Sequence, residues 1–494
     1  MLNTPIPELI IGLYSVAAFL ITLYTLGQFN LLYYFLTPNK PDRYHPKRPD
    51  YTWEELPTVT VQLPMYNEFY VAKQVIDACA QLEYPADKLE VQVVDDSTDE
   101  TVEIVRERVE YWQQKGVDVK MVHRENRQGF KAGALRDATP MAKGEFLAIF
   151  DADFRPHPDF LLKTIPYFQD EKIGIVQGRW GHLNREYSFL TRSQSIFLDM
   201  FFVIEQQARS LKQFFLRFNG SGGVWRKSCI EDAGGWSADT LSEDLDLCFR
   251  AQLKDWKIIY DTTIEAPAEI PVTMLDFKAQ QYRWTKGKAQ VIRKLTGKIR
   301  AKKLPFFEKL HIWFDLYNIL AIPSILIIAV LSIPLTLLMM ETREYDVFLS
   351  IFSIALTNVL LAPWFAWIVI RKHYSDSRKA ALKEMLKFFF HFISMLIGIS
   401  LFQFISMVDG FVSNKAFFKR TSKYNITSKN DTWKDKVYRP HEVPLVTYLE
   451  GLFAIYFAWG IYIDIKYMAV AFLPFHIILV VGYTYVFLSS FRKG

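Results

Sequence analysis

Long apolar runs near both ends of this 494-residue chain restrict its fold more than any other feature of the sequence. Residues 9–35 are predominantly apolar, and they are long enough to cross about 30 Å of hydrocarbon as a tilted helix. Further apolar runs of spanning length cover residues 316–340, 347–370, 445–463 and 468–488. We therefore expect a helical membrane bundle around one soluble domain. The chain would divide into a first span in residues 1–36, a soluble domain at 56–300, two spans in 310–370, a cytosolic or interfacial segment at 371–441 and two spans in 442–494.

The distribution of basic residues predicts how the chain lies in the membrane. Residues 388–408 are apolar enough to span, but a crossing there would put eight of the fourteen Lys and Arg of residues 371–439 outside the cytosol. Since cytosolic loops carry the excess of Lys and Arg, we expect this segment to lie in the interface instead. We expect no charged residue to be buried within a span. This absence disfavours a transport protein, because transporters carry such residues along their substrate pathways. The three cysteines show no CxxC spacing, which suits a reducing compartment for the soluble part.

The middle of the chain has the pattern of an α/β domain. Runs rich in β-formers at residues 59–63, 91–94, 117–122 and 146–150 alternate with helix-like segments, which predicts a parallel, doubly wound sheet. The last of these runs ends in Asp151 and Asp153. Ligands of such sheets bind at the carboxyl ends of the strands. Two interpretations of this Asp-x-Asp stretch remain open. Either it is an ordinary solvated turn from strand to loop, or one carboxylate meets a ligand directly while the other holds a divalent cation.

Other polar clusters add candidates to the same edge of the sheet. The first two strands run into residues 64–68 and 95–99, which also carry acidic groups. The GSGG stretch at residues 220–223 predicts either a turn that approaches a ligand closely or an ordinary loop. Ser242 can cap a helix whose first turn is acidic, which the helix dipole alone would also favour. The basic segment around residues 280–284 would also suit a helix lying on anionic lipid.

Seven motifs together resemble one enzyme family. VQLPMYNE, VVDDST, RQGFKAGAL, FDADF, FNGSGGVWR, LSEDLDL and QQYRW occur in the order and approximate spacing of the processive family 2 glycosyltransferases. The chain resembles bacterial cellulose synthase-like proteins, and FNGSGGVWRKSCIEDAGGW most resembles the plant cellulose synthase-like A and C branch of glucomannan and glucan synthases. The resemblance covers residues 59–423 and ends in a segment similar to the gating loop of cellulose synthase, where Arg420 replaces an aliphatic residue and leaves the docking of that loop open.

The resemblance implies an α/β, Rossmann-like nucleotide-sugar domain of the GT-A type, embedded in an α-helical transmembrane bundle. It also implies roles for the residues that match the family motifs. Nucleoside contacts would come from Tyr66, Glu68 and Asp95 or Asp96, diphosphate contacts from Lys131 and Asp151, and Mg²⁺ or Mn²⁺ ligands from Asp151 and Asp153. Asp244 would be the general base, Gln280, Arg283 and Trp284 would form the acceptor and leaving-group motif, and Asn219, Gly220 and Ser221 would line the acceptor site.

The expected activity is that of a metal-dependent, inverting hexosyltransferase. It would polymerise the hexose of UDP-glucose or GDP-mannose into a β-1,4-linked glucan, mannan or glucomannan and translocate the growing polysaccharide across the lipid bilayer. The expected location is a bacterial inner membrane, with the catalytic domain in the cytosol. An accessory export or regulatory subunit is a possible partner, and no nucleic acid partner is expected. A non-processive glycolipid synthase and a catalytically silent membrane scaffold remain as alternatives. The sequence does not choose the donor.

Overall fold

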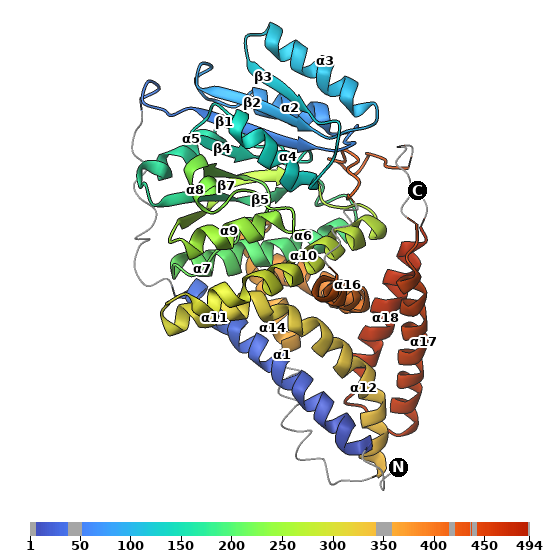
Figure 1. Ribbon diagram of the computed structural model, residues 1–494. Coiled ribbons are helices and arrows are strands. Elements are labelled where there is room, and N and C mark those ends of the chain that lie inside the picture. Colours follow the sequence, from blue (N-terminus) through green and yellow to red (C-terminus); the bar gives the residue numbers. More distant parts are fainter. Residues whose placement is uncertain are drawn as a thin grey trace.

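A computed structural model describes residues 6–37, 52–341, 358–413, 420–434, 436 and 442–492. A sheet-containing domain occupies one end of the molecule, and long helices extend away from it (Figure 1). Within the described residues, five helical segments are long and apolar enough to cross a membrane. These segments are Ile6–Leu36, Phe306–Met340, Arg378–Val412, Leu445–Lys466 and Leu473–Ser490.

The domain is built on a seven-stranded sheet with the order β3-β2-β1-β4-β6-β5-β7. Its strands are β1 (Val59–Met65), β2 (Leu89–Asp95), β3 (Asp118–His123), β4 (Phe146–Ile149), β5 (Ile173–His182), β6 (Gly223–Arg226) and β7 (Lys257–Ala268). The four predicted runs correspond to the first four strands, which pair in parallel. β6 is antiparallel to both β4 and β5, so the sheet is mixed rather than wholly parallel.

The last three strands were not predicted, and in β5 and β7 the strand-like pattern is interrupted. β5 is interrupted by Gly174, Gly178 and Gly181, and β7 carries Asp261 and Glu265 among its apolar residues. The register between the two strands shifts twice, at Ile173/Ile175 and at Gly178/Arg179. Such irregularities break the period-two alternation by which half-buried strands are recognised in a sequence.

β4 shows why the sheet is buried on both faces. Phe146, Ala148 and Phe150 point into one apolar core, whereas Leu147 and Ile149 point into another. The first core is completed by α2 (Ala72–Ala80), α3 (Thr101–Gln114) and α5 (Phe160–Thr164), and the second by α4 (Phe130–Ala138), α8 (Lys227–Asp232) and α9 (Glu243–Leu253). Since successive side chains of a strand alternate between faces, a strand covered by helices on both sides must be apolar throughout.

One long helix, α10 (Met274–Ala301), lies between the sheet domain and the other helices (Figure 1). Its apolar residues Ala289, Ile292 and Leu295 share a core with Phe249 of α9. The same core contains Ile312 and Leu316 of α11 (Phe306–Tyr317) and Met407 of α16 (Ser400–Val412). The sheet domain and the helical bundle are therefore joined through the side chains of α10.

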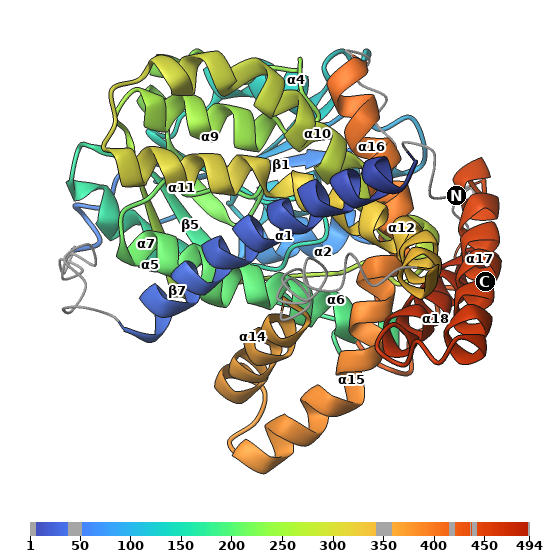
Figure 2. The ribbon, with the colours of Figure 1, turned by 90° about the horizontal axis from the view of Figure 1, so that it is seen from below.

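Apart from α6 (Phe189–Asp199) and α7 (Gln207–Leu211), which precede β6, the other described helices form the bundle. They are α1 (Ile6–Leu36), α12 (Ala321–Glu341), α14 (Asn358–His373), α15 (Arg378–Gly398), α17 (Leu445–Lys466) and α18 (Leu473–Ser490). Figure 2, a view from below, shows α1 crossing the middle of the molecule, with α14 and α15 to one side of it and α10 and α11 to the other. Residues 347–357 of the predicted span 347–370 lie outside the described residues.

The segment expected to lie in the interface, residues 388–408, is divided between two helices. α15 ends at Gly398, where a Cβ would meet the Gly482 carbonyl of α18 at 2.4 Å, and α16 begins at Ser400. In Figure 1, α16 is seen nearly end-on while α17 and α18 run down the page, so α16 lies across the direction of these two helices. Its placement in the interface stays a prediction.

The expectation that no charged residue is buried within a span is wrong. Glu450 lies inside the predicted span 445–463, and its side chain is buried. The sequence shows a single acidic residue among apolar ones, but only the structure reveals the cation that neutralises it, Lys278 of α10.

Candidate active site

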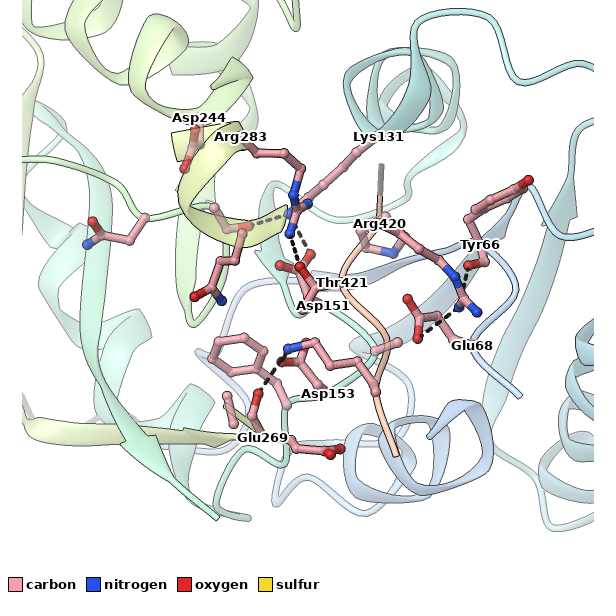
Figure 3. Close-up of a pocket in the computed structure, with 18 of the residues that line it drawn as sticks. Tyr66, Glu68, Lys131, Asp151, Asp153, Asp244, Glu269, Arg283, Arg420 and Thr421 are labelled. Carbon is pink, nitrogen blue, oxygen red and sulfur yellow. Dashed lines mark hydrogen bonds and ion pairs between the residues drawn. The ribbon is translucent and has the colours of Figure 1, made fainter. Parts of the chain in front are cut away.

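A pocket at the carboxyl ends of β1 and β4 brings together most of the predicted site residues (Figure 3). Twelve of the fourteen line it: Tyr66, Glu68, Asp96, Lys131, Asp151, Asp153, Asn219, Gly220, Asp244, Gln280, Arg283 and Trp284. They come from strand ends, helix N-termini and α10, which lie far apart in the sequence. Their functional roles remain predictions, but their convergence on one pocket is a property of the fold.

The two predicted residues outside the pocket have structural partners. Asp95 is fully buried at the end of β2, where its carboxylate contacts Nδ1 of His123 at 2.9 Å and accepts the backbone N–H of Ser97 at 3.2 Å. Ser221 is also buried, and its hydroxyl accepts the backbone N–H of Asp151 at 2.9 Å. Of the pair Asp95 and Asp96, the structure places only Asp96 on the pocket wall.

Arginines surround the part of the pocket predicted to hold the nucleoside. Arg124 donates two hydrogen bonds to the Asp96 carboxylate, at 2.7 and 2.6 Å. The guanidinium of Arg127 lies 3.3 Å from the centre of the Tyr66 ring, within the range of a cation–π contact. Burial raises the pKa of Glu68 to about 8, although the nearby Arg420 opposes this shift. Arg127 is the first residue of the RQGFKAGAL motif, so the motif was the sequence signal for this residue.

Lys131 links the loop after β4 to the loop before β6. Its ammonium group donates to the Asp151 carboxylate and, at 2.8 Å, to the carbonyl of Gly220. Burial lowers the pKa of Lys131, but the carboxylates of Asp151, Glu243 and Asp244 outweigh it, so the pKa lies above its ordinary value. Lys131 is therefore a fixed positive charge within the pocket.

Asp244 lies in the first turn of α9, where the helix dipole favours an anion. Ser242 occupies the cap position as predicted, but its side chain makes no capping hydrogen bond. Burial raises the pKa of Asp244, and Lys131 only partly offsets this effect. Gly220 has φ +81°, and a Cβ there would lie 3.0 Å from a carboxylate oxygen of Asp244, so this turn packs closely against the start of α9. Its close approach to a ligand stays a prediction.

Two indole rings contribute to the apolar part of the pocket. Trp284 of α10 and Trp180 of β5 have ring centres 6.5 Å apart, and the Trp180 N–H donates to the Ser221 carbonyl at 3.0 Å. An indole presents a flat apolar face and one N–H donor, which suits stacking on the C–H face of a sugar ring. Trp180 was not predicted, because the strand that carries it was not recognised.

The segment that begins at Arg420 is docked in the pocket. Arg420 donates to the carbonyls of Tyr66 and Asn67, and its guanidinium lies 3.5 Å from the Glu68 carboxylate. Thr421 accepts a hydrogen bond from Arg283 at 2.7 Å. From the sequence, it was open whether this loop docks, because Arg420 departs from the gating pattern. In the structure, Arg420 itself contacts the segment after β1. Phe418 and Lys419 of that pattern lie outside the described residues.

Lys423 is the second lysine that contacts an expected metal ligand. Its ammonium group donates to the Asp153 carboxylate and, at 2.9 Å, to the carbonyl of Glu269. The Glu269 carboxylate accepts the backbone N–H groups of Tyr424 and Asn425, at 3.0 and 2.7 Å, and burial raises its pKa to about 7. Nothing in the sequence pattern singled out Glu269.

The predicted metal ligands fit a divalent cation in part. Asp151 and Asp153 provide the hard oxygen atoms that Mg²⁺ and Mn²⁺ prefer, and both line the pocket. Each carboxylate already accepts from a lysine ammonium group, so this end of the pocket is arranged to hold positive charge. No group of three or more His, Cys, Asp or Glu suited to a metal is found in the described part of the chain. The other ligands would be water molecules or phosphate oxygens of a bound ligand.

Residues 57–287 match the family described as Glycosyltransferase like family 2. This part of the chain is therefore similar to the catalytic domains of family 2 glycosyltransferases. The family match includes every pocket residue from Tyr66 to Trp284, whereas Arg420, Thr421 and Lys423 lie beyond it. The predicted resemblance to family 2 glycosyltransferases is confirmed.

Two curated relatives of the family 2 domain are plant enzymes. The chain is 41% identical over 304 residues to glucomannan 4-beta-mannosyltransferase 1 of Oryza sativa subsp. japonica, covering 60% of this chain and 58% of that protein. It is 39% identical over 318 residues to glucomannan 4-beta-mannosyltransferase 2 of Arabidopsis thaliana, covering 62% and 60%. The chain therefore spans less than two thirds of the length of these relatives.

A solved structure shares the fold. It is mannosyltransferase PcManGT from Pyrobaculum calidifontis, in complex with GDP-Man and Mn²⁺. The TM-score is 0.51 and the sequence identity 20%, with 81% of this chain and 99% of that chain covered. Together with the family match, this similarity confirms the predicted GT-A type α/β domain, accompanied by apolar helices of spanning length.

Proposed function

We propose that this protein is a membrane-embedded hexosyltransferase that adds mannose from GDP-mannose to a growing β-1,4-linked polysaccharide. The observation that carries the proposal is the convergence of Asp151, Asp153, Asp244 and Trp284 on one pocket of a family 2 domain. The choice of mannose rests on the plant relatives, which are named as glucomannan 4-beta-mannosyltransferases. UDP-glucose remains the competing donor.

In the proposed reaction, Asp244 removes a proton from the acceptor hydroxyl as that oxygen attacks the anomeric carbon. Its pKa, raised by burial, makes it a stronger base than an ordinary aspartate. General-base help of this kind contributes about 10² to 10⁴-fold to the rate, or about 3 to 5 kcal/mol. Attack from the side opposite the diphosphate inverts the anomeric centre and gives a β-linkage from an α-linked donor.

The cationic groups of the pocket would stabilise the departing diphosphate. Lys131 and Arg283 line the wall that includes Asp151, and a guanidinium can donate two parallel hydrogen bonds to phosphate oxygens. A Mg²⁺ or Mn²⁺ ion held by Asp151 and Asp153 would supply further neutralisation of the phosphate charge. Trp284 and Trp180 would hold the terminal sugar of the acceptor by stacking.

We further infer processive synthesis coupled to translocation. The acceptor side of the pocket is formed by α10, which packs directly on the helical bundle, so a product leaving that side would meet membrane helices rather than solvent. The excess of basic residues in 371–439 supports a cytosolic catalytic domain, with a bacterial inner membrane as the expected location. This proposal includes the predicted division of the chain into a first span, a soluble domain at 56–300, and two pairs of spans separated by the segment 371–441.

The test is incorporation of labelled sugar by purified protein in lipid nanodiscs. GDP-mannose, UDP-glucose, UDP-N-acetylglucosamine and UDP-galactose would be compared with Mg²⁺ or Mn²⁺, and the product digested with linkage-specific hydrolases. We expect a long product from GDP-mannose that a β-1,4-mannanase degrades. Label found only in an organic-soluble lipid would instead identify a glycolipid synthase, and no incorporation from any donor would contradict the proposal.

A further inference from the structure

The helix α10 presents two different faces to its surroundings. Gln280, Arg283 and Trp284 line the pocket. Lys278, Gln281, Tyr282 and Lys286 instead bond to the bundle helices α16 and α17. Successive residues of an α-helix are separated by about 100°, so residues three and four apart share a face. The two sets follow this spacing, which places the bundle contacts directly behind the acceptor-binding side chains.

The more deeply buried of the two ion pairs on this face joins α10 to α17. The Lys278 ammonium group donates to the Glu450 carboxylate at 2.6 Å and to the Thr447 hydroxyl at 3.1 Å. The Lys278 and Glu450 side chains are 1% and 0% exposed. Lys278 stands two residues before Gln280, within one turn of the pocket-lining residues of α10. A shift of Glu450 would therefore be transmitted to the acceptor site through less than one helical turn.

Contacts with α16 continue the same face of α10. Gln403 donates to the side-chain oxygen of Gln281 at 2.9 Å. Asp409 accepts from Tyr282 and, at 2.7 Å, from Lys286. The two helices approach so closely that a Cβ on Gly410 would lie 2.6 Å from the Lys286 carbonyl. α10 is thus held against the bundle by polar contacts over about two turns, not by apolar packing alone.

Stability alone does not account for the Lys278–Glu450 pair. Burial lowers the pKa of Lys278, which shows that the charged form loses favourable hydration in this environment. A buried ion pair is often no more stable than well-packed apolar residues of similar volume, because desolvation offsets the attraction. What such a pair does provide is a defined register between two elements, since a small slide leaves two charges unpaired. Here the elements are the acceptor helix and a membrane helix.

We propose that Glu450 and Asp409 are positioning residues for glycosyl transfer, which hold α10 so that its acceptor-binding face stays aligned with Asp244. The inference rests on the proposed function, and it extends the active site to two residues of the apolar helices. Neither residue lines the pocket, so neither is expected to contact the donor. Their loss should therefore affect the use of the acceptor far more than the binding of the nucleotide-sugar.

The first experiment compares Glu450→Gln with Asp464→Asn in nanodiscs. Asp464 lies on the same helix and is equally buried, but it pairs with His476 of α18 rather than with α10. For Glu450→Gln we expect a KM for the donor within about twofold of wild type and a kcat for transfer reduced about tenfold or more, because misplacing reacting groups slows the reaction without weakening donor binding. The share of donor lost to hydrolysis should rise. Asp464→Asn should retain the wild-type ratio of transfer to hydrolysis.

A charge exchange tests the pair itself. Lys278→Glu combined with Glu450→Lys restores opposite charges at the same two positions, and the Thr447 hydroxyl can donate to the new carboxylate. We expect the double variant to recover much of the transfer rate that each single variant loses, which a general packing defect would not permit. Failure of the exchange to restore transfer, with both single variants folded, would overturn the inference.

Asp409→Asn gives a second route that does not depend on a fully buried site, since the Asp409 side chain is 33% exposed. It should show the same fall in kcat at constant donor KM. The inference is overturned if this variant and Glu450→Gln transfer sugar at the wild-type rate, or if they lower the ratio of transfer to hydrolysis no more than Asp464→Asn does. If the wild-type protein itself transfers no sugar, it is the proposed function that fails.

Discussion

Replacing Gly287 by alanine should separate the proposed catalytic base from the acceptor helix. Gly287 lies in α10 against Ser242, the residue that precedes α9 and its Asp244. A Cβ at position 287 would lie 2.2 Å from the Ser242 hydroxyl, 2.8 Å from its backbone nitrogen and 3.0 Å from the Leu241 carbonyl carbon. Two of these three atoms belong to the backbone, so rotating a side chain cannot remove the clash.

The size of the expected effect follows from these distances. Ordinary contacts to a Cβ begin near 3.4 Å, so the start of α9 must move away from α10 by roughly 0.5 Å or more. Overpacking of this kind destabilises a protein by about 1 to 3 kcal/mol. Moving reacting groups by about 1 Å can slow a reaction about 10²-fold. We therefore expect kcat to fall by about one to two orders of magnitude, with donor affinity little changed.

The assay measures transfer rates and, by calorimetry, donor binding for Gly287→Ala and Gly297→Ala. Both substitutions are in α10, but Gly297 is exposed and a Cβ there would meet nothing within 4 Å. Gly297→Ala should leave kcat unchanged and stabilise the helix by about 0.5 to 1 kcal/mol, because glycine in a helix interior is less favourable than alanine. A wild-type kcat in folded Gly287→Ala would refute the idea that this contact sets the position of Asp244.

Three further predictions concern the charged groups of the pocket. Asp244→Asn should lower transfer by about 10² to 10⁴-fold while calorimetry shows donor binding largely intact, because the base acts on the acceptor; lost donor binding would contradict the assignment. Asp153→Ala should weaken Mn²⁺-dependent donor binding, and an unchanged Mn²⁺ titration would move the metal site elsewhere. Lys131→Met removes a charge that lowers the pKa of Asp244, so the acidic limb of the pH–kcat profile should move to higher pH. A limb that stays in place or moves to lower pH would exclude that coupling.

Part of the fold could be read from local patterns. The apolar run of β4 predicted a strand covered on both faces, and its end correctly placed Asp151 and Asp153 at the edge where the pocket lies. β5 and β7 were missed, because glycines and charged residues interrupt them and their registers shift. Trp180, which faces Trp284 in the pocket, was missed with its strand.

The sequence by itself determined the apolar runs of spanning length, the first four strands of the sheet and the family 2 motifs, because each depends on residues close together in the chain. Only the tertiary structure decided that Asp96 rather than Asp95 reaches the pocket, since the two are neighbours at the end of β2 and only Asp96 lines the pocket wall. Only the tertiary structure brought Lys423 to Asp153 and Glu450 to Lys278. These partners are more than 150 residues apart, and no local periodicity records which distant charge will neutralise a buried one; that choice is made when the helices pack.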